Sequence, residues 1–171
     1  RIKRQPGASL YYYVPDGLVH KILELIKYRN QPELAEGLGH YYGKMLCEIP
    51  CYHDTDIVIP VPLHPKREIH RGYNQSFLFG RALANELGAA IFSDVLIRIH
   101  HTTSQTEKDR FSRNENMKNV FKLSKPEIIK DKNILLVDDV LTTGATLESC
   151  AIELEKGFPK TISMATIAIG R

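Results

Sequence analysis

Residues 134–146 of the chain read ILLVDDVLTTGAT, and this stretch decides the fold. The apolar run 134–137 is typical of a strand that is buried on both faces of a parallel sheet. Two adjacent acids at 138–139 follow the strand, and the hydroxyl-rich turn at 142–146 leads into a helical pattern. The stretch therefore predicts a strand, a loop with acidic and hydroxyl side chains, and a helix.

The turn after the acids is suited to a phosphate. A phosphate at the start of a helix meets unpaired backbone N–H groups and the positive end of the helix dipole. Gly144 lets the backbone come close to the anion, and the hydroxyls of Thr142, Thr143 and Thr146 can donate to it.

The acid pair Asp138 and Asp139 would repel that phosphate at short range, so we expect it several ångströms away, on donors of the same ligand. Vicinal sugar hydroxyls are such donors. The loop thus predicts a ribose 5-phosphate site, with carboxylates on the 2′- and 3′-hydroxyls and amides on the 5′-phosphate. It has neither the Lys of a G-K-[ST] loop nor G-x-G-x-x-G, which argues against nucleoside triphosphate and dinucleotide sites.

A plainer interpretation of the same loop is structural. The acids would then end a strand, and Thr143 would cap a helix. Aspartates that are buried in structural ion pairs, or that point away from any cavity, would support this interpretation.

The rest of the chain alternates between helical and strand patterns, which predicts an α/β fold with a parallel sheet flanked by helices. A helical segment over residues 1–55, forming a small hood, is expected to precede an α/β domain over residues 56–171. The expected helices are 18–28, 32–49, 74–87 and 145–156, and the expected strands are 57–61, 95–99, 120–123, 134–137 and 161–169. Residues 100–118 are polar and predict a mobile surface segment that is partly helical.

Ligands of such sheets lie at the carboxyl ends of the strands, so the loops after Val61, Ile99 and Val137 are expected to meet at one site. The first of these loops carries Lys66, Arg67 and, further on, Arg71. These cations are either anion ligands or ordinary solvated side chains.

The composition sets broad limits. The chain has 171 residues, 43% of them hydrophobic, and a net charge of +3, which does not demand a polyanionic partner. Three cysteines without C-x-x-C spacing support neither a disulfide framework nor a zinc ribbon, so a reducing cytoplasm is expected. No apolar run approaches the ~20 residues that span a bilayer. Because the first residue is not methionine, we expect a fragment without its N-terminal part.

The similarity to known proteins extends beyond the acid pair. Residues 71–75 (RGYNQ), 105–106 (QT), Arg113, Asn116 and Phe121, together with the 134–146 stretch, resemble the ComF/GntX branch of type I phosphoribosyltransferase-like proteins. The resemblance covers the chain from about Leu18 onward and implies the type I phosphoribosyltransferase fold. Members often carry an N-terminal zinc ribbon, which is absent from this sequence.

The resemblance implies a role for each matching residue. The ligand would be 5-phosphoribosyl-1-diphosphate with Mg²⁺, which would reach the protein through the ligand or through a water on Asp138 or Asp139. Arg113, Lys66 and Arg67 would be catalytic, and residues 98–119 would match a loop that closes over the site. The ribose would be bound by Asp138 and Asp139, the 5′-phosphate by Thr142, Thr143, Gly144, Ala145 and Thr146, and the diphosphate by Pro62, Leu63, His64, Lys66, Arg67 and Arg71.

Two functions follow from the resemblance. In the first, the protein is a phosphoribosyltransferase that moves the phosphoribosyl group to or from a nitrogen base or amine. In the second, it is a non-catalytic phosphosugar-binding adaptor of a competence or DNA-uptake apparatus, with protein or single-stranded DNA partners. The cluster at 11–13 (YYY) either packs inside, forms an interface such as that of a homodimer, or stacks on a base.

Overall fold

The computed structural model describes residues 3–99 and 120–170. Its strands are β1 (Lys3–Tyr13), β2 (Ile57–Pro60), β3 (Ala90–Ile91), β4 (Leu96–Arg98), β5 (Phe121–Leu123), β6 (Asn133–Leu141) and β7 (Thr161–Gly170). Its helices are α1 (Leu18–Tyr28), α2 (Pro32–Leu46), α3 (Pro50–His53), α4 (Pro65–Arg71), α5 (Gln75–Leu87), α6 (Pro126–Ile129) and α7 (Ala145–Glu155).

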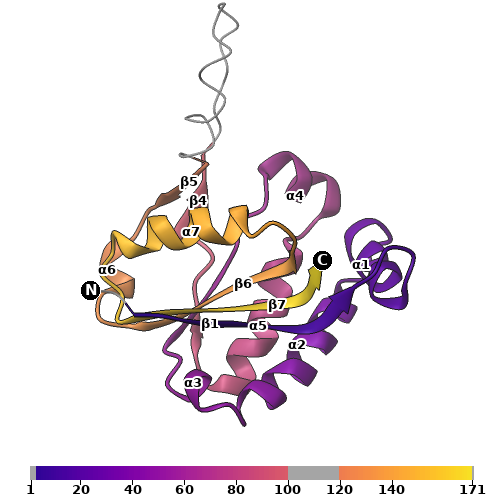
Figure 1. Ribbon diagram of the computed structural model, residues 1–171. Coiled ribbons are helices and arrows are strands. Elements are labelled where there is room, and N and C mark those ends of the chain that lie inside the picture. The colour runs from indigo at the N-terminus through magenta and orange to yellow at the C-terminus, as the bar shows by residue number, and fades with distance from the viewer. Residues whose placement is uncertain (1–2, 100–119, 171) are drawn as a thin grey trace, which may run out of the picture.

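A five-stranded parallel sheet forms the centre of the molecule, with the strand order β1-β7-β6-β2-β3 (Figure 1). The predicted α/β fold with a parallel sheet is therefore confirmed. β6 lies in the middle because its apolar residues pair with β2 on one side and β7 on the other, for example Leu136 with Ile59 and with Met164. All of these strands end on the same side, which places the loop after β6 among the loops of its neighbours.

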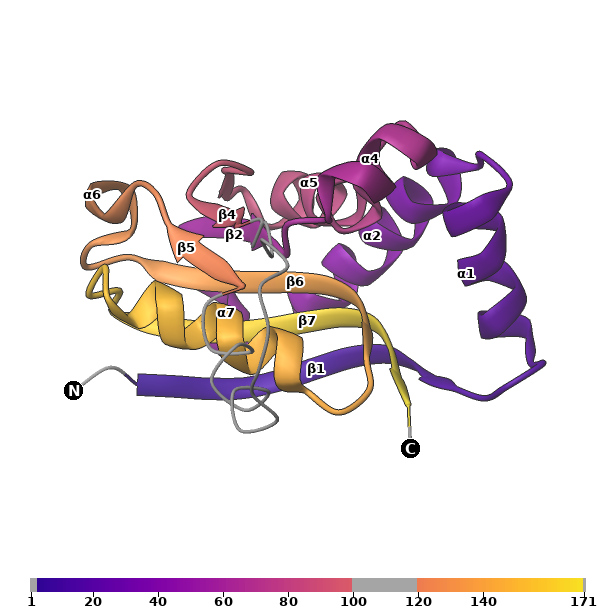
Figure 2. The same cartoon turned by 90° about the horizontal axis from the view of Figure 1, so that it is seen from above.

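Helices cover both faces of this sheet. Alternate side chains of β6 point to opposite faces. Leu135 and Val137 pack in a cluster with side chains of α1, α2 and α5, whereas Ile134 and Leu136 pack in a cluster with side chains of α7. Figure 2 shows α2 and α5 on the far side of the sheet from α7. The sheet therefore lies between two apolar cores, one on each of its faces.

The helices α2 and α5 pack closely because glycines lie between them. A Cβ atom at Gly39 of α2 would lie 2.5 Å from the carbonyl oxygen of Phe79 in α5. One turn later, a Cβ atom at Gly43 would lie 2.7 Å from the Cβ atom of Glu86. The middle and the last turns of α5 are therefore packed directly against α2.

The N-terminal segment differs from the expectation of helices alone. Residues 3–13 form β1, an edge strand that pairs in parallel with β7 and has a register shift between Arg4 and Gly7, next to Pro6. Proline lacks the N–H that a central strand must donate, so it is confined to edges and irregularities such as this one. The division of the chain at residue 55 stays a prediction, although β1 shares the sheet of the following segment.

The strand predicted at 95–99 does not join the parallel sheet. It forms β4, which pairs antiparallel with β5, so Arg98 lies opposite Phe121. The short strand β3 takes the sheet edge beside β2 instead. A helix long and apolar enough to cross a membrane is not found in the described part of the chain.

Candidate phosphosugar site

The acid pair lies at the carboxyl end of β6. This strand extends further than predicted, because residues 138–141 still pair with β7, with Asp138 opposite Thr166. The side chains of Asp138 and Asp139 are held by the first turn of α5. Figure 1 shows α4 and α1 near the same end of β6.

Asp138 is bound by neutral donors. The Ser76 hydroxyl donates to its Oδ1 at 2.9 Å, and the backbone N–H of Asp139 donates to the same oxygen at 2.9 Å. Burial and the neighbouring charge of Asp139 raise the pKa of Asp138 to about 7, although both hydrogen bonds oppose this shift. Asp138 therefore retains a proton to a higher pH than an ordinary aspartate does.

Asp139 lies in a different environment. Lys27 of α1 places its Nζ 2.9 Å from Oδ2 of Asp139, and Gln75 donates to the same oxygen at 2.8 Å. Arg71 in turn donates to the amide oxygen of Gln75, and its guanidinium lies 5.7 Å from the ring centre of Tyr28. The condition that favoured the structural interpretation is thus met in part, since Asp139 is only 6% exposed and forms an ion pair.

Both acids nevertheless line a cavity of about 180 Å³. Arg67, Arg71 and Arg98 line it as well, so basic and acidic side chains share the wall of the cavity. Burial and the nearby charge of Arg67 lower the pKa of Arg98, which indicates that these two cations lie close together. An anion between them would relieve this repulsion.

The turn after β6 provides the second half of the site. Gly144 is the N-cap of α7 with φ +81°, a left-handed conformation that glycine adopts without strain. Among residues 3–99 and 120–170, no side chain caps this helix at its N-cap, and the N–H of Ala145 donates a long hydrogen bond of 3.4 Å to Thr143 Oγ1. The N–H groups at the start of α7 are therefore at most weakly bound by described side chains, the arrangement that favours an anion.

A small hollow of about 20 Å³ lies against this turn. Thr142, Thr143, Gly144 and Thr146 line it, whereas Ala145 is not among its lining residues. Asp138 and Thr146 line both the hollow and the larger cavity, so the two are adjacent. Acidic oxygens and helix N–H groups thus meet at one strand-to-helix corner.

The remaining predicted residues are divided between cavity and surface. Pro62 and Leu63 line the cavity, as does Arg67 at the start of α4. Lys66 is exposed and does not line it, and the His64 ring accepts a hydrogen bond from the N–H of Lys66 at the start of the same helix. Arg113 lies outside the described residues, as do most of the residues of the predicted closing loop.

Six residues that line the cavity were not predicted as site residues: Lys27, Tyr28, Val61, Gln75, Ser76 and Arg98. Lys27, Tyr28 and Ser76 line the cavity, yet nothing in their local sequence marks them. Lys27 and Tyr28 are the last residues of an amphipathic helix, and a basic residue is common at this end because it interacts favourably with the helix dipole. Their role depends on how α1 docks, which sequence periodicity does not report.

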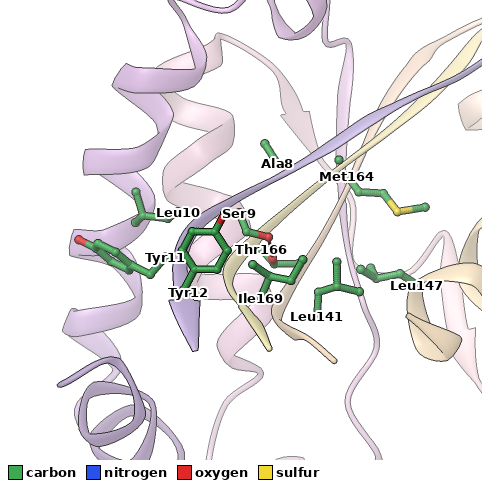
Figure 3. A pocket seen from close by; sticks show the side chains of 11 residues that line it. Ala8, Ser9, Leu10, Tyr11, Tyr12, Leu141, Leu147, Met164, Thr166 and Ile169 are labelled. Atoms are coloured by element: carbon green, nitrogen blue, oxygen red, sulfur yellow. Dashed lines mark hydrogen bonds between the residues drawn. The ribbon is translucent and has the colours of Figure 1, made fainter. Parts of the chain in front are cut away.

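A larger cavity, of about 470 Å³, lies beside β1 and β7 (Figure 3). Leu141, Leu147 and Met164 line it with residues of β1, and its lining includes no charged side chain. Its buried polar contact is the 2.6 Å hydrogen bond between Ser9 and Thr166. An anionic ligand would find no counter-charge there, so the smaller cavity at the acid pair is the better candidate.

The sequence comparisons identify the family of the chain. The family model described as "Phosphoribosyl transferase domain" matches residues 74–171, more than half of the chain. The chain belongs to this phosphoribosyltransferase family. The match begins at the N-cap of α5 and includes β6, the acid pair and the turn that opens α7.

Curated relatives place the chain in the ComF-type branch of this family. It is 38% identical over 140 residues to "Competence protein F" of Haemophilus influenzae, covering 79% of this chain and 61% of that protein. It is 26% identical over 165 residues to "Competence protein ComFC" of Bacillus subtilis, covering 93% of this chain and 62% of that protein. The chain thus spans less than two thirds of the length of these relatives.

Solved structures confirm the type I phosphoribosyltransferase fold. A glutamine phosphoribosylpyrophosphate amidotransferase from B. subtilis superposes with a TM-score of 0.57 at 15% identity, over 85% of this chain and 30% of that chain. Adenine phosphoribosyltransferase from Saccharomyces cerevisiae gives a TM-score of 0.52 at 18% identity, over 84% of this chain and 72% of that chain. At these identities the likeness shows the fold alone.

Mg²⁺ prefers six oxygen ligands in octahedral geometry, and the site offers it only part of such a set. Within residues 3–99 and 120–170, no group of three or more His, Cys, Asp or Glu side chains is arranged to hold a metal ion. Asp138 and Asp139 supply carboxylate oxygens at one place. These two residues fit a Mg²⁺ ion that takes most of its ligands from a bound diphosphate and from water.

Proposed function

We propose that this chain binds 5-phosphoribosyl-1-diphosphate with Mg²⁺ at the corner between β6 and α7 and transfers the phosphoribosyl group to a nitrogen base or amine. The observation that carries this proposal is the sharing of Asp138 and Thr146 between the cavity and the hollow. A single ligand can therefore meet carboxylates with its ribose hydroxyls and helix N–H groups with its 5′-phosphate.

The carboxylates are suited to such hydroxyls. Their hydrogen bonds to described residues end on one oxygen each, Oδ1 of Asp138 and Oδ2 of Asp139. The other oxygen of each carboxylate can then accept from a ligand. Hydrogen bonds to charged groups contribute about 1.5–3 kcal/mol each, so two sugar hydroxyls would give substantial affinity.

The diphosphate would lie toward Arg67, Arg71 and Arg98, whose guanidinium groups can bind phosphate oxygens in pairs. In the transfer, the bond from C1 of the ribose to the diphosphate oxygen breaks, and a bond from C1 to the acceptor nitrogen forms. The diphosphate leaves with the bonding electrons, and the acceptor nitrogen releases its proton to water. Bound Mg²⁺ would neutralise part of the diphosphate charge. The protein's contribution is electrostatic: arginines stabilise the leaving group, and the acid pair holds the ribose.

A second function is favoured by the names of the relatives. These include "Competence protein F" and, in Escherichia coli, "DNA utilization protein YhgH". In this alternative the chain is a phosphosugar-binding adaptor of a DNA-uptake apparatus.

Calorimetric titration with phosphoribosyl diphosphate and Mg²⁺ tests the shared proposal of ligand binding. We expect binding by the wild type and no heat for the double variant Asp138→Asn/Asp139→Asn. The matched control is Asp16→Asn/Asp131→Asn, which removes two exposed acids at positive φ, a conformation that asparagine tolerates. Equal binding by the wild type and the acid-pair variant would refute the site.

A second assay separates the enzyme from the adaptor. A panel of purine and pyrimidine bases and simple amines is incubated with the ligand, and diphosphate release is measured. Release with at least one acceptor, lost in the acid-pair variant, supports the enzyme. Binding without release by any acceptor, together with salt-dependent binding of single-stranded DNA, supports the adaptor.

A further inference from the structure

The last turn of α1 reaches into the site, although the family match begins only at residue 74. Lys27 and Asp139 form an ion pair of 2.9 Å between side chains that are 23% and 9% exposed. Such a pair is largely withdrawn from water, so removal of one partner leaves the other charge uncompensated. This ion pair differs from the ordinary contacts of surface lysines, which contribute little.

The backbone of α1 holds Lys27 in this place. Leu23 and Ile26, on the same helix, are 2% and 0% exposed in the core. The Tyr73 hydroxyl donates to the carbonyl oxygen of Ile26, and Arg71 stacks over Tyr28. The two sequence neighbours of Lys27, Ile26 and Tyr28, are therefore both held by contacts with residues that precede α5.

The two acids also differ in their partners. Asp139 Oδ2 receives a cation and an amide, whereas Asp138 Oδ1 receives a hydroxyl and a backbone N–H. Among residues 3–99 and 120–170, no basic side chain forms an ion pair with Asp138. A divalent cation that approached both carboxylates would thus have to compete with an ammonium that is paired with Asp139 and whose charge also acts on Asp138.

We propose that Lys27 is the built-in counter-cation of Asp139, which keeps a divalent cation from bridging the acid pair and leaves Asp138 as the carboxylate that faces ligand-borne Mg²⁺. This inference rests on the proposed function for the role of the ligand, but the exclusion of free metal is a property of the protein alone. Lys27 is a positioning residue in this scheme, because it acts through Asp139.

The test uses Mn²⁺ as the probe, in the absence of any phosphoribosyl ligand, with binding followed by electron paramagnetic resonance. We expect Lys27→Met to bind Mn²⁺ about tenfold more tightly than the wild type, because a unit positive charge beside the carboxylates has been removed. The matched control is Lys21→Met, which removes an exposed lysine from the same helix and should leave Mn²⁺ affinity unchanged. Equal affinity in Lys27→Met and Lys21→Met would overturn the proposal.

Two further variants keep the test decisive if Lys27→Met does not fold. Lys27→Gln retains a donor for Asp139 but no charge, so it should also gain Mn²⁺ affinity. Lys27→Arg retains the charge and should not. The gain must disappear in Lys27→Gln/Asp139→Asn, since a gain that persists would place the new metal site elsewhere.

The two proposals can fail separately. The Mn²⁺ measurement contains no sugar phosphate, so a wild type that does not bind phosphoribosyl diphosphate would refute the proposed function and leave the Lys27 result standing. Conversely, normal binding of phosphoribosyl diphosphate with no gain in Mn²⁺ affinity would refute only the role of Lys27.

Discussion

Substitution of Gly39 by alanine tests the close packing of α2 on α5. A Cβ atom at this position would lie 2.5 Å from the carbonyl oxygen of Phe79 and 2.6 Å from the Cβ atom of Ala82. Real Cβ atoms essentially never come within 3.0 Å of another heavy atom, and the nearest atom here belongs to the main chain. The two helices must therefore move apart.

The expected loss of stability can be worked from two opposing effects. Overpacking costs about 1–3 kcal/mol, and a clash with main chain favours the upper end of this range. Alanine recovers about 1 kcal/mol over glycine within a helix. The free energy of unfolding should thus fall by about 2 kcal/mol, which lowers Tm by roughly 4–8 °C for a chain of this size.

The assay is urea unfolding followed by far-UV circular dichroism, with Gly37→Ala as the control. Gly37 lies on the same helix, and a Cβ atom there would meet nothing within 4 Å. Gly37→Ala should therefore raise the free energy of unfolding by about 1 kcal/mol. If Gly39→Ala were as stable as Gly37→Ala, the packing of α2 on α5 described above would be wrong.

Three more predictions concern the site. Asp138→Asn should stabilise the ligand-free protein more above pH 7 than below pH 4. The pKa of Asp138 is raised to about 7 in the fold, so the folded protein retains a proton that the unfolded chain loses, and wild-type stability falls between about pH 4 and pH 7. Urea unfolding of both proteins across this pH range measures the difference. Asn74→Ala should cost about 1–2 kcal/mol by thermal unfolding, because Asn74 caps α5 through the N–H of Ser76 and also donates to the carbonyl of Val61. Arg71→Met should weaken phosphoribosyl diphosphate binding roughly ten- to hundredfold by calorimetry, as expected for one charged hydrogen bond, whereas Arg81→Met, which removes a half-exposed arginine of α5, should not.

The parts of the molecule that sequence could predict are those with local causes. The strand 134–137, the acid pair and the turn that opens α7 were recognisable because apolar run, acids and hydroxyls stand next to one another. The meeting of Arg67 and Arg71 with the acid pair followed from the rule that parallel strands end on one side of the sheet.

The parts that sequence could not predict depend on distant partners. β1 was missed because its apolar run is confined to residues 10–13, near the start of the sequence, and Pro6 and Gly7, which usually interrupt strands, precede it. The strand at 95–99 was recognised, but its pattern did not show that its partner would be β5 and not the parallel sheet. The contact of Lys27 with Asp139 joins segments more than one hundred residues apart, and no local pattern encodes it.

The parallel arrangement also determines where the protein can be attached to a surface or a label. β1 begins at the amino ends of the strands, the opposite end of the sheet from the candidate site (Figure 2). β7 ends beside the turn, since a Cβ atom at Gly170 would lie 3.6 Å from the Cγ2 atom of Thr142. Immobilisation through the first residues should therefore leave ligand access intact, whereas a bulky fusion directly after residue 171 would start beside the phosphate turn.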